Sequence, residues 1–149
     1  MKNIYKILTA VMLFGLMLTA ASAQALKGEW KLVEAKSGGE KVVYTEEIHT
    51  TVSFGENNGM SGNSGCNRYS TSYVLTGKKI KFNPIISTKM ACEGERMKQE
   101  NTFFSVIEKT NRYKIKGDYL TFYDRSSRNV LKFRLVSGQV SQNTAPQKC

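Results

Sequence analysis

The chain has 149 residues and carries 22 Lys and Arg against 12 Asp and Glu, a formal net charge of +10. This length suits one domain with a real hydrophobic core. The cationic balance suits anionic partners, such as phospholipid headgroups, lipopolysaccharide, cell-wall polymers or nucleic acid, although charge that serves only solubility is the favoured interpretation. With a single histidine and no Cys-x-x-Cys pair, we expect no structural or catalytic zinc site.

The first 23 residues have the three parts of a cleavable signal peptide. Lys2 and Lys6 form a positive start, residues 7–18 form a short apolar run, and Ala21-Ser22-Ala23 supplies the small residues of a cleavage site before Gln24. We therefore expect a secreted or periplasmic domain with no transmembrane segment after cleavage, and its net charge is then +8. The alternative is an uncleaved anchor. Export also argues against a nucleic-acid partner.

Alternation of apolar and polar residues predicts a chain made mainly of short β-strands. Turn residues separate the segments, as Asn57-Asn58-Gly59 does after the second strand. The strands are expected at 26–35, 49–54, 60–66, 67–75, 79–82, 112–116, 119–123 and 130–136, with a short segment at 42–44 and a brief pairing at 88–92. Residues 137–149 are polar, without periodicity, and are expected to be a disordered tail.

Residues 94–109 are the exception, because their apolar residues recur at helical spacing. Met97, Phe103, Phe104 and Ile107 form the predicted apolar stripe of this helix. Glu100 lies near the stripe. It is either a buried carboxylate with hydrogen-bond partners or a residue at the stripe's edge that reaches solvent, and the second interpretation is favoured.

The positive charges of the last strands fall on one face. In residues 112–116, Arg112, Lys114 and Lys116 alternate with Tyr113 and Ile115, and residues 131–135 follow the same pattern. A sheet with one apolar face must bury it, and closure into a barrel also removes exposed strand edges. The predicted fold is a mainly β, compact antiparallel barrel with the helix capping one end and with Lys and Arg outside.

Three cysteines follow the predicted signal peptide, at positions 66, 92 and 149. Cysteines of a small domain in an oxidising compartment usually pair. Cys66 and Cys92 lie in patterned sequence, whereas Cys149 ends the polar tail, so we predict a Cys66–Cys92 disulfide; two buried free thiols are the alternative. Cys149 is then a free thiol or the link of a disulfide-bonded dimer of an otherwise monomeric protein.

No arrangement of residues nominates a catalytic site, a metal site or a cofactor. His49 has no partner motif and is expected at the surface. Gly59, Gly62 and Gly65 are wrongly spaced for a phosphate-binding loop and do not open a helix. The few acids are scattered, so no carboxylate pair can be assigned to glycoside hydrolysis.

The segment 62–73, GNSGCNRYSTSY, resembles the Gly-Cys-Asn signature of the META-domain family, typified by the heat-shock protein HslJ. Other segments that resemble the family occur in the expected order over residues 26–136. They are 30–32 and 52–54 before the signature, and 88–92, Glu100 with Phe103 and Phe104, and 131–133 after it. The resemblance implies a domain over 24–136 with a lipocalin-like barrel and one helix, an envelope or secreted setting, a loose link to stress response and antibiotic tolerance, and no established enzymatic activity. The chain lacks the lipid-anchoring cysteine of some members.

The resemblance makes Gly65, Cys66, Asn67, Arg68, Tyr69 and Cys92 the candidate site residues. We expect Asn67 to bond local backbone at a bend, while contact of Asn67, Arg68 and Tyr69 with a ligand is the alternative. The expected function is a non-catalytic envelope protein that binds another protein or an anionic component. Alternatives are a barrel that holds a small apolar ligand and, with less support, an inhibitor of a secreted protease.

Overall fold

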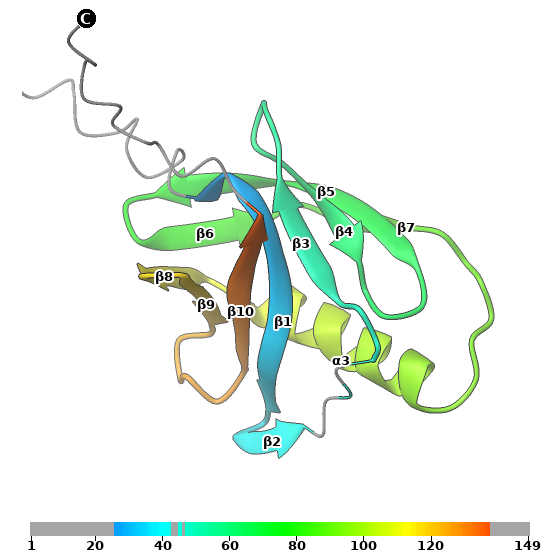
Figure 1. Cartoon of the computed structure of the whole chain (residues 1–149). Coiled ribbons are helices and arrows are strands. Elements are labelled where there is room, and N and C mark those ends of the chain that lie inside the picture. Colours follow the sequence, from blue (N-terminus) through cyan, green and yellow to red (C-terminus); the bar gives the residue numbers. More distant parts are fainter. Residues whose placement is uncertain (1–25, 43–44, 46, 138–149) are drawn as a thin grey trace, which may run out of the picture.

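The computed structural model describes residues 26–42, 45 and 47–137 (Figure 1). The predicted signal peptide, residues 138–149 of the predicted tail, and Cys149 lie outside these ranges. Their roles therefore stay predictions.

The described residues form ten β-strands and the helix α3. The elements, in chain order, are β1 (Gly28–Ser37), β2 (Glu40–Val42), β3 (Thr51–Phe54), β4 (Gly59–Asn63), β5 (Arg68–Thr76), β6 (Lys79–Phe82), β7 (Ile86–Ser87), α3 (Glu95–Lys109), β8 (Arg112–Lys116), β9 (Tyr119–Tyr123) and β10 (Val130–Ser137).

Eight of the strands close into an antiparallel barrel, which confirms the predicted fold class. The order around the barrel is β1, β3, β4, β5, β6, β8, β9 and β10, and β10 pairs with β1 to close it. Each strand therefore lies beside its neighbour in this series, as in an up-and-down barrel. The short strands β2 and β7 lie outside the ring and pair with β1 and β5.

Period-two alternation directs one set of side chains into the barrel and the other to solvent. Phe122 lies at the centre of the core, where its ring makes edge-to-face contacts with Phe54, Phe82 and Phe133 at centroid distances of 5.3–6.3 Å. The turn before β4 also follows the sequence pattern. Asn57 and Asn58 both have positive φ, the geometry of a type I′ hairpin turn.

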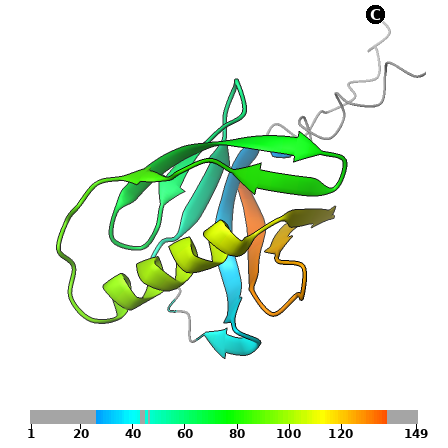
Figure 2. The ribbon, with the colours of Figure 1, turned by 180° about the vertical axis from the view of Figure 1, so that it is seen from behind.

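Helix α3 lies across the opening between the β5–β6 hairpin and strands β1 and β10 (Figure 2). Its buried apolar side chains are Phe103, Val106 and Ile107, which join the barrel core. Met97 and Phe104 are only half-buried, so the buried stripe is rotated slightly from the predicted one.

The predicted brief pairing at 88–92 is present only at its first residue: strand β7 covers Ile86–Ser87, and the Thr88 N–H still donates to the Arg68 carbonyl of β5 at 3.0 Å. Beyond that bond the polar groups of the chain have other partners. The Thr88 hydroxyl and the Met90 N–H both donate to the Asn67 side chain, at 2.8 and 2.7 Å. These bonds hold residues 88–90 in a loop against β5 instead of a ladder.

The barrel interior is filled by side chains. Trp30, Phe122, Phe133, Leu120 and Met60 are at most 2% exposed. A hollow beneath the helix, lined by Leu32, Phe103 and Leu131 among others, measures about 10 Å³, which is room for about one water molecule. This packing gives no support to the alternative of an apolar ligand inside the barrel.

Candidate functional site

The Gly-Cys-Asn signature forms the connection between β4 and β5. Gly62 precedes it in β4, where a Cβ atom would lie 2.0 Å from the Thr51 carbonyl oxygen, so only glycine fits. Gly65 has a φ of 113°, which glycine adopts easily, and its N–H donates to Asn63 Oδ1 at 2.8 Å. These two glycines allow the chain to turn sharply and present residues 64–67 to helix α3.

Glu100 projects from α3 into this turn and is only 6% exposed. Its Oε2 accepts hydrogen bonds from the Ser64 hydroxyl and from the Asn67 N–H, the latter at 2.8 Å. Its Oε1 accepts a bond from Asn67 Nδ2, also at 2.8 Å. Within the described part of the chain no Lys or Arg forms an ion pair with Glu100, so these hydrogen bonds compensate its carboxylate.

The favoured interpretation of Glu100 as a solvent-reaching residue was therefore wrong. A carboxylate so close to the core is stable there because three donors satisfy it. The neighbouring Gln99 is also buried, and its Nε2 donates to Thr50 Oγ1 at 3.0 Å. Two polar residues thus interrupt the apolar face of the helix, and both bond to the β3–β5 side of the barrel.

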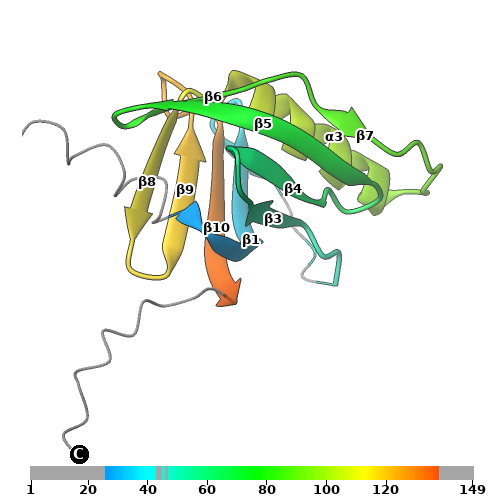
Figure 3. The ribbon, with the colours of Figure 1, turned by 90° about the horizontal axis from the view of Figure 1, so that it is seen from above.

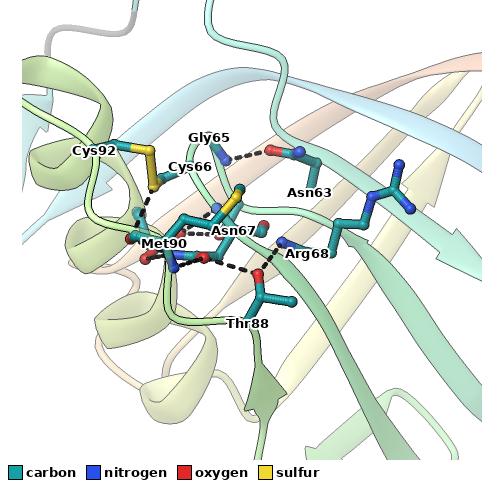
Figure 4. The surroundings of a disulfide bond; sticks show 10 residues. Asn63, Gly65, Cys66, Asn67, Arg68, Thr88, Met90 and Cys92 are labelled. Atoms are coloured by element: carbon teal, nitrogen blue, oxygen red, sulfur yellow. Dashed lines mark hydrogen bonds between the residues drawn. A yellow bond between two sulfur atoms is a disulfide. The ribbon is translucent and has the colours of Figure 1, made fainter.

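Asn67 connects Glu100 to the loop between β7 and α3. Figure 4 shows the loop side of this connection, with Asn67 beside Thr88 and Met90. While its Nδ2 donates to Glu100, its Oδ1 accepts from the Thr88 hydroxyl and the Met90 N–H. The expectation that Asn67 bonds local backbone was wrong, since these partners lie more than twenty positions along the chain. All three segments, the β4–β5 turn, the loop and the helix, meet at this one side chain.

A disulfide between Cys66 and Cys92 fastens the same loop beside Asn67, as the sequence predicted (Figure 4). The two cysteines are 26 positions apart, and their Cα atoms lie 5.9 Å from each other. Closing a loop of this length stabilises the folded chain by about 3.5 kcal/mol in the chain-entropy model. We call Ser64, Cys66, Asn67, Cys92 and Glu100 the signature clamp.

The other two candidate residues point in opposite directions. Tyr69 is buried, its hydroxyl donates to the Thr51 carbonyl at 2.9 Å, and its ring packs against Phe103 and Phe104. Burial raises the pKa of the Tyr69 hydroxyl far above its usual value. Arg68 is exposed, and its backbone bonds to Thr88: its N–H donates to Thr88 Oγ1 at 3.2 Å, and its carbonyl accepts from the Thr88 N–H at 3.0 Å.

The clamp has the geometry of a structural connection more than of a reactive centre. The side chains of Ser64, Asn67 and Glu100 form hydrogen bonds with one another or with the loop, and all three residues are buried. No group of three or more His, Cys, Asp or Glu residues within the described ranges could hold a metal ion. His49 is exposed, in agreement with its expected place at the surface.

A second feature is the outer surface of β6, β8 and β10, which we call the cationic face. Figure 3 shows β8, β9 and β10 side by side below the β5–β6 hairpin. The outward residues of β6, β8 and β10 include seven cations and no carboxylate: Lys79, Lys81, Arg112, Lys114, Lys116, Lys132 and Arg134. Strand β9 adds Tyr119 and Tyr123, which lie under Lys132 and Arg112 at 4.6 and 4.7 Å.

Comparison with known families agrees with the signature and the barrel. A family model described as the META domain matches residues 23–137, most of the chain. The chain belongs to the META-domain family. No curated protein matches it. No helix among the residues that the structure describes is long and apolar enough to cross a membrane.

Solved structures of similar fold extend this comparison. A Burkholderia xenovorans protein solved by NMR is 22% identical, with a TM-score of 0.64, over 78% of this chain and 88% of that one. A second NMR structure is 23% identical, with a TM-score of 0.57, over 80% and 96% of the two chains. A DUF4847-family protein from Bacteroides vulgatus is 12% identical, with a TM-score of 0.57, over 73% and 92%. At these identities the likeness is one of fold.

Proposed function

We propose that this META-domain protein is an exported, non-catalytic module that binds an anionic component of the cell envelope through its cationic face. The observation that carries the proposal is the set of seven outward Lys and Arg residues on β6, β8 and β10, with no carboxylate among them. Within the described residues the one ion pair joins Lys36 to Glu34, so none of these seven charges forms an ion pair, and the one acidic cross-strand neighbour among them is Glu34, opposite Lys132.

Unpaired cations on one face attract an anionic surface more strongly than the same charges scattered over the molecule. Tyr119 and Tyr123 support this use of the face, because aromatic rings beside cations are common where proteins meet headgroups or charged polymers. The signature clamp then acts as the brace that holds the loop and the helix against the barrel. Export and a role during stress rest on the signal peptide and the family resemblance.

Binding is tested with the purified protein and anionic vesicles or envelope extracts, by co-sedimentation at low and at physiological salt. The expected result is binding at low salt that weakens as salt rises, because screening shortens the reach of exposed charges to about 8 Å at 0.15 M. Vesicles of zwitterionic lipid are the control. Absence of binding at low salt contradicts the proposal.

Export has a separate test. The protein recovered from the envelope or the medium of cells that express the full chain should begin at Gln24. A protein that stays inside the cell with its first residues intact contradicts the export part alone.

A further inference from the structure

One place on the cationic face differs from the rest, the junction between β6 and β8. Neighbouring strands elsewhere in the barrel share two or more residue pairs, whereas β6 and β8 share only Lys79 opposite Arg112. Two backbone bonds flank this pair, from Ile80 N to Asn111 O and from Tyr113 N to Lys78 O. Beyond them the strands diverge, and a hollow of about 810 Å³ opens on the outside of the barrel.

This hollow, which we call the seam groove, combines four cations with an apolar wall. Its lining includes Lys79, Lys81, Arg112, Arg125, Val74 and Ile80, and none of its lining residues is acidic. The side chain of Ile80 is buried, whereas Val74 is 54% exposed at the rim. The groove therefore offers positive charge and an exposed apolar side chain within one concave surface.

The charges of the seam groove repel one another in the free protein. Lys79 and Arg112 are direct cross-strand partners, an arrangement that destabilises a sheet when the charges are alike. Arg112 is fixed in place, because its Nη2 donates to the carbonyls of Asp124 and Arg125 at 2.9 and 2.8 Å. Its Nε is buried without a hydrogen-bond partner. A bound anion would relieve the repulsion.

The carboxylate of Asp124, whose backbone carbonyl accepts from Arg112, does not supply that anion. Asp124 uses its two carboxylate oxygens within its own turn, where they accept bonds from Ser126 Oγ, Asn129 Nδ2 and the Arg128 N–H. Partial burial acts to raise the pKa of Asp124, but these hydrogen bonds outweigh it, so the pKa lies below its usual value. The turn thus positions Arg125 and the carbonyls that hold Arg112, and leaves the groove without an internal counter-ion.

We propose that the seam groove binds the phosphate of an anionic phospholipid headgroup at a bilayer surface. This proposal rests on the proposed function and assigns its ligand and its place. Four cations around one hollow suit a phosphate better than a single carboxylate, because phosphate presents several strong acceptor oxygens. Val74 at the rim suits the apolar part of a lipid and would gain nothing from a free phosphate ion.

The test compares two double variants that remove equal charge from exposed positions of the cationic face. The seam variant is Lys79→Gln with Lys81→Gln, and the matched control is Lys114→Gln with Lys116→Gln, which lie outside the groove. The affinities of both variants and of the unchanged protein are measured for phosphatidylcholine vesicles with and without phosphatidylglycerol. We expect the seam variant to bind at least about tenfold more weakly than the control variant.

The possible results separate the two proposals. If the unchanged protein does not bind the phosphatidylglycerol vesicles at low salt, the proposed function itself fails. If both variants weaken binding equally, the cationic face acts as a diffuse surface, and the seam groove is overturned while the proposed function stands. If inorganic phosphate at millimolar concentration shifts the amide signals of the groove and displaces the vesicles, the ligand is a soluble phosphate and the lipid assignment is overturned.

Discussion

Replacing Glu100 by Gln tests the signature clamp with the smallest possible change of shape. The carboxylate accepts three hydrogen bonds, two at Oε2 and one at Oε1. An amide has one accepting oxygen and one donating nitrogen. If its nitrogen takes the place of Oε1, it faces Asn67 Nδ2, another donor; if it takes the place of Oε2, it faces two donors.

The loss of stability can be estimated from the better of these two orientations. One bond to a charged acceptor, worth about 1.5–3 kcal/mol, is lost, and two others fall to the value of neutral bonds, about 1 kcal/mol each. Taken at the lower end of this range, because a neutral amide costs less to bury than a carboxylate, these losses amount to about 2.5 kcal/mol, and Glu100→Gln should lower the free energy of unfolding by that amount. For a domain of this size the melting temperature should fall by about 10–15 °C.

Urea unfolding of the oxidised protein measures this change through the fluorescence of Trp30, the only tryptophan, which is 2% exposed. The midpoint should move to lower urea with an unchanged slope. Glu108→Gln is the matched control, because Glu108 lies on the same helix, is exposed and forms no ion pair within the described residues; it should change stability by less than about 0.5 kcal/mol. Equal stability of the two variants would refute a supporting role of the clamp.

Three further predictions follow from the structure. Cys66→Ser should lower the free energy of unfolding by about 3.5 kcal/mol, an effect that reduction of the unchanged protein should reproduce; a variant as stable as the oxidised protein contradicts it. Gly62→Ala should destabilise by more than about 2 kcal/mol in thermal unfolding, because its Cβ would meet backbone, whereas Gly55→Ala has space and should change little. Because the folded-state pKa of Asp124 is depressed, the contribution of this carboxylate to folding stability is complete above about pH 4 and is lost as pH falls through the folded-state pKa. Between pH 6 and pH 2 the melting temperature of Asp124→Asn should therefore fall less steeply than that of the unchanged protein. Parallel curves for the two proteins would contradict this prediction.

The sequence predicts the barrel well because the pattern that specifies it is local. Alternation places Tyr113 inside and Lys114 outside whatever the rest of the chain does, and β6, β8 and β9 have the predicted ends. The antiparallel meander then follows from short connections between successive strands. The outcome at residues 88–92 shows the limit, since beyond the Thr88 N–H the side chain of Asn67, from a distant turn, replaces the expected ladder.

The contacts of the candidate site could not be predicted in the same way. The donors to Glu100 come from positions 33 and 36 residues earlier, so nothing in the helical pattern distinguishes a buried carboxylate from an exposed one. The available signal is weak, namely two adjacent polar residues, Gln99 and Glu100, in the middle of an apolar stripe. The seam groove is harder still, because Lys79 and Arg112 become neighbours only when the barrel closes.

The pairing of β1 with β10 has a consequence for how this protein folds. Trp30 lies opposite Val52 of β3 on one side and Leu135 of β10 on the other, so one edge of β1 finds its partner nearby, whereas the other edge pairs with a strand from the far end of the domain. Contacts so distant in sequence carry a high loop-closure cost and slow the folding reaction. Until β10 arrives, β1 keeps an unpaired edge that can join other chains. A protein with this topology gains from delayed folding, and loss of the last described strand alone would leave it open to aggregation.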